Sequence, residues 1–261
     1  IGKTTLNIGS NVTITLASGG ICGNDVVIDI SSNTILELSG GQMAMQAFCT
    51  IQGEGELLVT AGSHDLAFSI DAHITIQGGA MVWPLSRGSG ETITFKGGLL
   101  MENTGALLVN PFSTTIRILK EVYLKDEILI EFPLIGIAAQ ASVFDEQDAP
   151  DPSPRGNLFA EAIMRWEGGT LKGKADFNAQ DALFLDGKTK YIKSLAKLVN
   201  RGHCEWGTGD LVSSDSGDFL NFGTVQMKSG AASFSSSAMY QGTELPIENG
   251  GDVFALEYHS W

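Results

Sequence analysis

The sequence predicts an all-β fold, a parallel β-solenoid in which one chain winds short strands into stacked coils. Three observations predict it: many glycines, few charged residues, and short sequence frames that recur along the chain. Glycine supplies 32 of the 261 residues and charged residues make up 18%, where about 25% charged is usual. Frequent turns and little exposed helix explain both departures.

The first recurring frame is a short strand led by asparagine. Asn11 opens NVTITL, Asn24 opens NDVVIDI and Asn33 opens NTILEL. Each run is rich in β-branched and aliphatic residues, in alternation or without a break, as β-strands are. The clusters between the runs contain Gly, Ser and Asn, which tolerate a positive φ or bond their own backbone. We therefore predict strands within 11–16, 24–30 and 33–38, separated by tight turns.

The second frame is TIQG, which occurs at 50–53 and again at 75–78. The related TFKG follows at 94–97, after a somewhat shorter interval. Each copy precedes an apolar run, at 55–59, 79–83 and 98–101. The unit therefore predicts a strand, a glycine turn and a second strand.

The third frame is Asn-x-Gly, which is led by Asn103, Asn200, Asn221 and Asn249. The last three copies follow one another closely, and apolar residues precede each asparagine. Asparagines that recur at one corner can stack into a ladder of side-chain amides, which satisfies backbone groups at each turn. We predict such a turn ladder from these four residues.

Loose recurrence at roughly 20 to 28 residues is typical of stacked coils, because the loops absorb changes in length. About nine to eleven coils fit the chain. A β-sandwich is the alternative fold, since it shares the short strands and turns. Its strands need not recur with the same corner residues, and this favours the solenoid.

One segment interrupts the recurrence of strands and turns. Residues 140–157 contain three prolines and a cluster of carboxylates and show no strand pattern, so they are interpreted as an acidic, proline-rich loop or linker. We expect a single solenoid domain over 1–261, with a domain boundary near 145–157 as the alternative. The stretch 158–166 is compatible with one or two turns of helix. No cofactor is expected, although the carboxylates at 145, 146, 148 and 151 offer oxygens that calcium favours; their spacing matches no known loop motif, and a solvated loop is the simpler interpretation.

Charge and composition limit the partners. The net charge of −14 repels a phosphate backbone, so nucleic acid is not expected as a partner. The longest strongly apolar stretch, 132–144, is shorter than the roughly 20 residues of a membrane-spanning helix, and we expect no membrane span. The chain opens at Ile1, which suggests a processed protein or a fragment and favours a secreted or extracellular, cell-surface associated location. Asn11 begins the sequon Asn-Val-Thr, a glycosylation site if the source is eukaryotic.

Three cysteines leave at least one thiol unpaired. Cys22 and Cys49 are separated in sequence by nearly the length of one coil, so they either form a disulfide or remain two buried thiols. His203 stands beside Cys204, but the other histidines show no metal-ligand spacing relative to it. Chance adjacency explains this pair.

The run from 17 to 41, ASGGICGNDVVIDISSNTILELSGG, together with the Asn-x-Gly frames, resembles the coils of the right-handed parallel β-helix superfamily. That superfamily includes pectate-lyase-like enzymes, adhesins and surface fibre proteins. The resemblance extends over most of the chain and implies a right-handed parallel β-helix. Its polysaccharide-cleaving members carry paired aspartates, Asn-Thr-Asp or Gly-His-Gly motifs on adjacent coils. None of these motifs stands in this sequence, so the resemblance implies no catalytic residue.

Two further clusters bear on function. Asp210, Asp215 and Asp218 lie close in sequence, but glycoside cleavage needs two carboxylates that face one bond, and their Ser- and Gly-rich setting favours a solvated turn. Seven of the sixteen basic residues fall between 172 and 201; they either dock an acidic surface of a neighbouring copy or decorate an exposed face that discourages edge pairing. The C-terminal run FALEYHSW is an aromatic edge that must be capped or paired. The residues expected at a subunit contact are Lys188, Lys190, Lys193, Lys197, Tyr258 and Trp261.

Repetition without a catalytic motif predicts a non-enzymatic extracellular structural protein, a subunit of a filament, surface layer or adhesin that assembles through solenoid ends and faces. Its partners are then copies of itself or related subunits. The alternative is a secreted β-helix protein that binds or cleaves extracellular polysaccharide, which predicts carboxylates and aromatic residues from successive coils along one groove. Ice or mineral binding would need a threonine array at a fixed interval, and the threonines are not so spaced.

Overall fold

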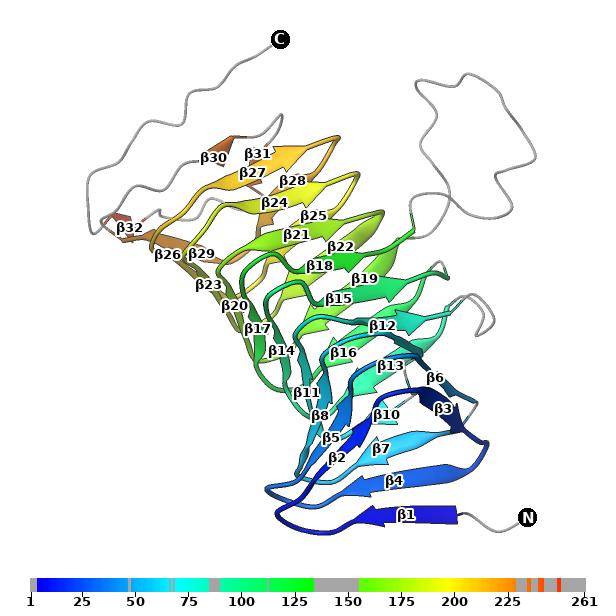
Figure 1. The fold of residues 1–261 in the computed structure, drawn as a ribbon. Coiled ribbons are helices and arrows are strands. Elements are labelled where there is room, and N and C mark those ends of the chain that lie inside the picture. Colours follow the sequence, from blue (N-terminus) through cyan, green and yellow to red (C-terminus); the bar gives the residue numbers. More distant parts are fainter. Residues whose placement is uncertain are drawn as a thin grey trace, which may run out of the picture.

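The structure is a computed structural model of the 261-residue chain. It describes residues 4–46, 48–65, 67, 69–84, 90–111, 113–133 and 155–228, and the strands at 234–235, 239–241 and 248–249. These residues form β-strands and turns and contain no helix. The strands wind into a column of stacked coils, with β1 in the coil at one end (Figure 1).

Each coil contributes one strand to each face of the column, except the last, whose described strands lie on two faces. The first sheet has the order β1 (Thr4–Ile8), β4 (Val26–Ile30), β7 (Thr50–Gln52), β10 (Ser69–Ile70), β13 (Thr92–Phe95), β16 (Thr115–Ile118), β19 (Gly156–Ala160), β22 (Ala175–Ala179), β25 (Lys197–Asn200), β28 (Asp218–Asn221) and β31 (Met239–Gln241). The second sheet has the order β2 (Thr13–Leu16), β5 (Ile35–Leu38), β8 (Glu56–Val59), β11 (His73–Ile76), β14 (Leu99–Met101), β17 (Val122–Leu124), β20 (Ile163–Trp166), β23 (Ala182–Leu185), β26 (His203–Trp206), β29 (Thr224–Met227) and β32 (Glu248–Asn249).

The third face is divided into two sheets. The pair β3 (Gly19–Cys22) and β6 (Gln42–Met45) begins it. The third sheet continues beside β6 with β9 (Ser63–Asp65), β12 (Ala80–Trp83), β15 (Ala106–Val109), β18 (Leu129–Glu131), β21 (Gly169–Lys172), β24 (Lys190–Lys193), β27 (Leu211–Ser214) and β30 (Phe234–Ser235).

Every strand pairing within the described residues is parallel, which confirms the predicted β-solenoid and excludes the antiparallel β-sandwich. The register gives the length of each coil directly. Thr4 pairs with Val26 and Thr50 pairs with Ser69, so the chain returns to the same face at intervals that vary slightly from coil to coil. The two longer sheets contain eleven strands each, which agrees with the predicted nine to eleven coils.

The ladders continue across the acidic, proline-rich segment. β16 pairs with β19, β17 with β20 and β18 with β21, so the coils before and after the segment are neighbours in all three sheets. Residues 134–154, which hold most of the predicted loop or linker, lie outside the described residues. The described part of that prediction, 155–157, already leads into β19. The stretch 158–166, whose sequence is compatible with one or two helical turns, instead forms most of β19 and β20.

The backbone conformation explains why asparagine occurs in two of the predicted turns. Asn11 and Asn33 each stand two residues before a strand of the second sheet, and both have a positive φ, 59° and 57°. Asparagine tolerates this left-handed conformation better than other residues with a side chain, except aspartate. Since Thr13 pairs with Ile35, the two asparagines occupy the same corner of successive coils.

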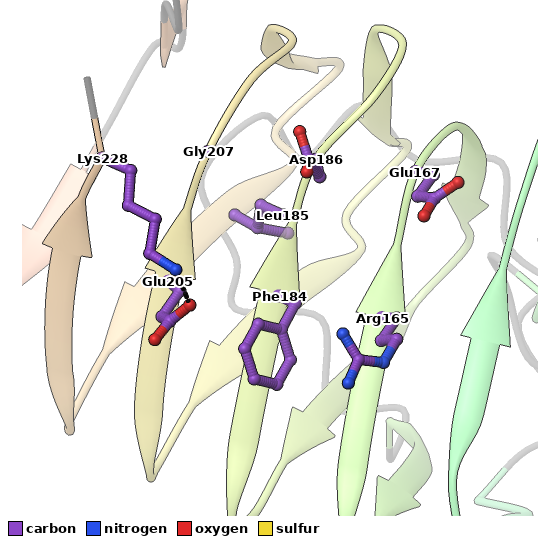
Figure 2. A pocket seen from close by; sticks show the side chains of 8 residues that line it. All are labelled: Arg165, Glu167, Phe184, Leu185, Asp186, Glu205, Gly207 and Lys228. Atoms are coloured by element: carbon purple, nitrogen blue, oxygen red, sulfur yellow. Dashed lines mark hydrogen bonds and ion pairs between the residues drawn. The ribbon is translucent and has the colours of Figure 1, made fainter. Parts of the chain in front are cut away.

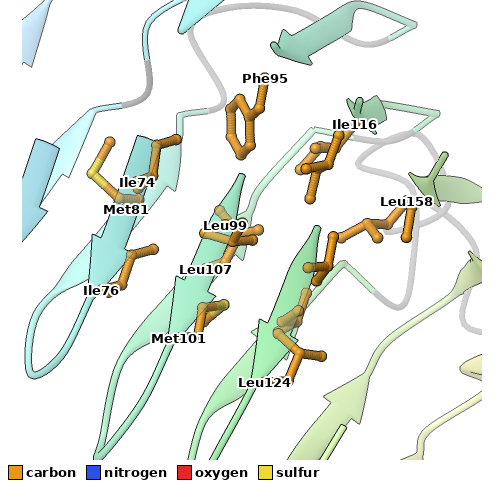
Figure 3. Close-up of a cluster of buried hydrophobic side chains, with 14 of the residues drawn as sticks. Ile74, Ile76, Met81, Phe95, Leu99, Met101, Leu107, Ile116, Leu124 and Leu158 are labelled. Atoms are coloured by element: carbon orange, nitrogen blue, oxygen red, sulfur yellow. The ribbon is translucent and has the colours of Figure 1, made fainter. Parts of the chain in front are cut away.

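Alternate side chains point into the column and form continuous rows. One row of the second sheet runs through Leu57, Ile74, Leu99 and Val122, all buried. Figure 3 shows Ile74 and Leu99 of this row packed with Phe95 and Met81 from the two other faces. The alternating apolar residues of successive strands thus form one continuous hydrophobic core along the column.

Candidate functional surfaces

Three places on the described molecule combine unusual side chains: a depression on the second sheet, the β1 end of the described column, and a buried polar row near the last coils. The depression lies on the outer face of the second sheet, over β20, β23 and β26 and the turns that follow them (Figure 2). It has a volume of about 230 Å3, less than the ~300–1,000 Å3 of most small-molecule pockets. Its lining residues are Arg165, Glu167, Phe184, Leu185, Asp186, Glu205, Gly207 and Lys228.

The depression is lined by an aromatic ring and a guanidinium from neighbouring strands. Arg165 and Phe184 are paired across β20 and β23, and the guanidinium carbon lies 4.5 Å from the centre of the ring. The same arginine donates a hydrogen bond from Nε to Glu121, at 2.7 Å. Both contacts fix a flat, amphipathic surface on the sheet.

The carboxylates of the depression are held by hydrogen-bond donors. Tyr123 donates to Glu167 at 2.6 Å, and this bond raises the pKa of Tyr123 to about 12. Donation from the Thr208 hydroxyl and from the backbone N–H of Gly187 lowers the pKa of Asp186.

Glu205 completes the depression. Its pKa is lowered, first by a hydrogen bond from Lys228. Since Asp186 and Glu205 are therefore ionised at neutral pH, they are suited to accept hydrogen bonds from hydroxyl groups and poorly suited to donate a proton.

At the β1 end of the described column the strands have unpaired edges. β1, β2 and β3 are the terminal strands of their sheets and are paired on one edge only among the described residues. Leu6 and Ile14 belong to inward rows, since they pair with the core residues Ile28 and Leu36. They are nevertheless 54% and 38% exposed. Core positions are thus left accessible at this end.

The predicted turn ladder is only partly formed. Asn200 and Asn221 pair across β25 and β28, and Nδ2 of Asn200 donates to Oδ1 of Asn221 at 2.7 Å. Both are buried. Asn103 instead lies in an exposed turn after β14, with φ 56°, and Asn249 lies in β32, paired with Met227. The four asparagines therefore do not share one corner, because equal local sequence does not fix the side of the coil on which a residue falls.

One hydrogen-bond acceptor in the buried amide row is unsatisfied. Oδ1 of Asn200 has no hydrogen-bond partner among the described residues. The residue paired with Asn200 in the preceding coil is Ala179, which has no side-chain donor. The row therefore begins at Asn200 and continues toward the later coils.

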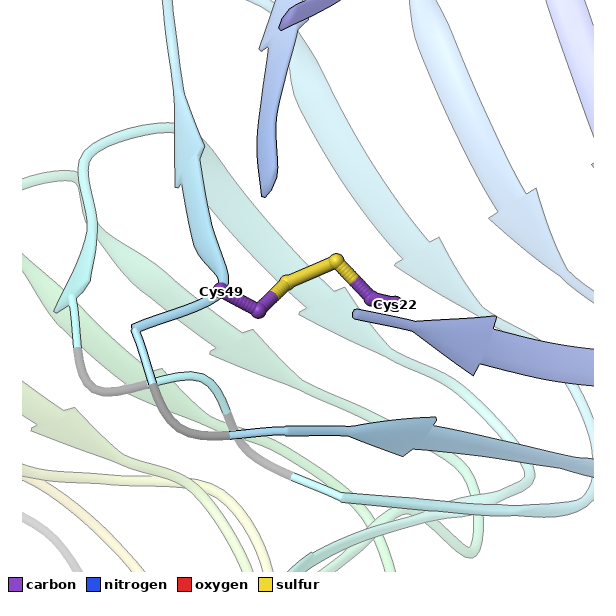
Figure 4. Close-up of a disulfide and its surroundings, with 2 residues drawn as sticks. All are labelled: Cys22 and Cys49. Atoms are coloured by element: carbon purple, nitrogen blue, oxygen red, sulfur yellow. A yellow bond between two sulfur atoms is a disulfide. The ribbon is translucent and has the colours of Figure 1, made fainter. Parts of the chain in front are cut away.

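The structure brings Cys22 and Cys49 together in a disulfide, with the Cα atoms 6.1 Å apart (Figure 4). The bond links the end of β3 to the turn before β7, in successive coils. Asn11 is exposed in the first coil. Cys204 is a buried free thiol, and burial raises its pKa.

His203 cannot act together with its neighbour Cys204. Successive residues of β26 point to opposite sides, so the histidine is exposed while the thiol faces the core. The ring of His203 instead contacts Thr224 and Glu205 on the outer face, at 2.8 and 3.6 Å.

The lysines expected at a subunit contact have different environments. Lys190 is fully buried, and its Nζ donates to the carbonyl oxygens of Lys188 and Thr208, so its assignment to a contact surface was wrong. It occupies an inward position at the start of β24, which its place in a lysine-rich run conceals. Lys188 pairs with Asp126 at 2.9 Å.

The other residues predicted at a subunit contact, and the three aspartates of the predicted acidic cluster, do not come together in the described structure. The ammonium group of Lys193 lies 4.6 Å from the centre of the Tyr191 ring. Lys197 is half-buried on β25, paired in register with Asp218. Burial raises the pKa of Asp218, which lies in the first sheet, whereas Asp210 and Asp215 flank β27 of the third. Tyr258, Trp261 and the carboxylates at 145–151 lie outside the described residues.

Neither a membrane-spanning helix nor a metal cluster is found in the described part of the chain. No helix there is long and apolar enough to cross a membrane. No group of three or more His, Cys, Asp or Glu side chains among the same residues is arranged to hold a metal ion.

The parallel register and the continuous interior rows define the class of protein: a β-solenoid repeat protein. No protein-family model matches the chain, and no curated protein or solved structure is significantly similar to it.

Proposed function

We propose that the protein is a non-enzymatic extracellular structural protein, a subunit of a filament, surface layer or adhesin that assembles through solenoid ends and faces. The proposal also assigns the chain to the right-handed parallel β-helix superfamily, among its non-enzymatic surface and fibre proteins. The observation that carries it is the column of parallel strands, in which each coil repeats the one before it and strand edges can pair with those of another chain.

A covalent link supports an extracellular assembly. The disulfide between Cys22 and Cys49 ties the first coils together, and disulfides persist in oxidising compartments outside the cytosol. The partners in this proposal are copies of the chain or related subunits.

Sedimentation velocity over a wide range of protein concentration tests the proposal. We expect dimers or larger species whose fraction grows with concentration, and electron microscopy would show whether they are elongated. A strictly monomeric protein at every concentration would contradict assembly.

The depression on the second sheet favours a second candidate, binding of extracellular polysaccharide. Phe184 supplies a ring for a sugar face, and the ionised Asp186 and Glu205 supply acceptors for its hydroxyl groups. A volume of about 230 Å3 suits a single subsite of a long chain and is small for an enclosed small-molecule pocket.

Glycan-array binding and a reducing-end assay on acidic polysaccharides test this candidate. Phe184→Ala should abolish binding. Phe222→Ala is the matched control, because Phe222 is also an exposed ring beneath an arginine, with Arg201 at 5.4 Å, but lies outside the depression. Equal loss in both variants, or no binding by the wild type, would contradict saccharide recognition at this place.

A further inference from the structure

The basic side chains of the depression on the second sheet are already paired with carboxylates. Three acidic and two basic side chains line the depression. Arg165 donates to Glu121 at 2.7 Å, and Lys228 donates to Glu205. Both contacts are ion pairs within the protein. An anionic ligand would therefore find no uncompensated cation in the depression.

Two carboxylates of the same depression are held by neutral donors. Glu167 follows β20 directly and Asp186 follows β23. Because these strands pair in register, the two carboxylates stand at the same corner of neighbouring coils, where adjacent strands are about 4.8 Å apart. The hydroxyl of Tyr123 donates to Glu167, and a threonine hydroxyl and a backbone N–H donate to Asp186. Neither carboxylate forms an ion pair with another residue that the structure describes.

The buried ammonium group of Lys190 does not take the place of an ion-pair partner. Its charge acts on both carboxylates, but its Nζ donates to the carbonyl oxygens of Lys188 and Thr208. Asp186 is exposed and Glu167 is half-buried, so both can be reached from the solvent. The pKa of Asp186 is lowered, first by the hydrogen bond from Thr208. This carboxylate is therefore ionised at neutral and at mildly acidic pH.

A flat surface lies beside the two carboxylates. Figure 2 shows Phe184 and Arg165 on the strands, and Glu167 and Asp186 farther along, where the turns begin. The guanidinium carbon of Arg165 lies 4.5 Å from the centre of the Phe184 ring, and the two groups form a surface on which a sugar ring can pack. A flat surface next to anionic acceptors suits a sugar ring that carries a positive charge.

We propose that the depression binds an amine-bearing polysaccharide, whose protonated amino groups contact Glu167 and Asp186 while one sugar ring packs on Phe184. This inference rests on the second candidate of the proposed function, binding of extracellular polysaccharide, and names its substrate class. The net charge of −14 attracts a polycation from solution and repels an acidic polysaccharide. A basic peptide offers the same charges without the sugar ring, so it should bind more weakly.

Isothermal titration calorimetry with the whole chain tests the substrate class. The probes are a fully deacetylated glucosamine hexamer, its N-acetylated form, a galacturonate hexamer and hexalysine, at a mildly acidic pH where the sugar amines carry protons. We expect the glucosamine hexamer to bind most tightly. The N-acetylated hexamer should bind at least about tenfold more weakly, because acetylation removes the charges and keeps the rings.

Asp186→Asn tests the place of binding. The substitution removes the charge but keeps an oxygen for the neutral donors, so the fold should survive, as circular dichroism would show. Binding of the glucosamine hexamer should weaken by about tenfold. Glu37→Gln is the matched control, because Glu37 is a carboxylate of the same sheet that also accepts from two hydroxyl groups, those of Thr15 and Thr60 at 2.9 and 3.0 Å, but lies outside the depression.

The outcomes separate this inference from the function on which it rests. Binding of hexalysine as tight as that of the glucosamine hexamer, or equal loss in Asp186→Asn and Glu37→Gln, would overturn the inference, since the charge of the whole protein would then explain the binding. Equal or tighter binding of the N-acetylated or galacturonate hexamer would show that the amine class is wrong while saccharide binding stands. If no oligosaccharide binds, both fail.

Discussion

Replacing Lys190 with methionine should remove a pH-dependent part of the protein's stability. Lys190 is fully buried as the first residue of β24, between Gly169 and Leu211 of the neighbouring coils. Its Nζ donates to the carbonyl oxygen of Lys188 at 2.9 Å. Burial lowers the pKa of the lysine to about 8, although nearby carboxylates act in the opposite direction.

The sign of the effect follows from proton binding. The unfolded chain has a lysine pKa of 10.5, so between pH 8 and pH 10.5 it keeps a proton that the folded chain has lost. The free energy of unfolding therefore rises with pH in this window, by at most about 1.4 kcal/mol per pH unit. The gain is lost as the pH falls through 8. Summed over the window from pH 8.5 to pH 10, this slope gives about 1–2 kcal/mol.

Cys204 acts against this gain. Its buried thiol has a raised pKa, whereas the unfolded thiol titrates near 9.0. Above that pH the unfolded chain loses a proton that the folded chain keeps, so stability falls. The effect of Lys190 is therefore measured in a Cys204→Ala background. Tyr123, whose pKa is raised to about 12, also lowers stability as the pH approaches 10, but equally in the proteins with and without Lys190, so it cancels in their comparison.

Urea unfolding at pH 7.5, 8.5 and 10, followed by the fluorescence of the buried Trp166 and Trp206, measures the difference. Cys204→Ala should become more stable from pH 8.5 to pH 10, and Cys204→Ala with Lys190→Met should not. Methionine suits the site because the next residue in its row is Leu211. The same rise in both proteins would refute the assignment of the effect to Lys190.

Three further substitutions should lower the urea concentration at which half of the protein is unfolded. Replacing both Cys22 and Cys49 with alanine releases a link across a sequence separation of 27 and should destabilise the protein by about 3–4 kcal/mol; an unchanged midpoint would contradict the disulfide. Gly223→Ala places a Cβ 1.8 Å from the carbonyl oxygen of Gly202 and should cost about 3 kcal/mol or more, while Gly9→Ala, with nothing within 4 Å, should change stability by less than about 1 kcal/mol. Asn221→Ala removes the acceptor of Asn200 and should cost about 1–3 kcal/mol; equal stability would show that the amide row contributes nothing.

The coil architecture was predictable from sequence, but the placement of individual frames was not. TIQG at 50–53 and TFKG at 94–97 begin in β7 and β13 of the first sheet, whereas TIQG at 75–78 falls in β11 of the second. The interval between the two TIQG copies is therefore not a coil length. A strand followed by a glycine turn suits any corner of the column, so local sequence identifies the unit without identifying its side.

The buried polar residues were hidden for a related reason. The inward row through Ile70, Phe95 and Ile118 continues as Ala160 and Ala179 and then as Asn200 and Asn221. Only the register shows that these asparagines stand in a core row and that Asn103 does not. Lys190 was concealed in the same way, because its inward position depends on the alternation of β24, and the nearest lysines in sequence, Lys188 and Lys193, are exposed and half-buried.

The distribution of charge connects the fold to its proposed assembly. Ion pairs along the column join different coils of one molecule, as between Lys172 and Glu131 or Lys188 and Asp126. Such pairs occupy basic side chains within the chain, so the run of lysines offers less positive surface to an acidic partner than its sequence suggests. The sides of the column therefore keep the acidic excess and repel other copies. This repulsion is the reason that the proposed function favours contact through strand edges of the column over contact through its sides.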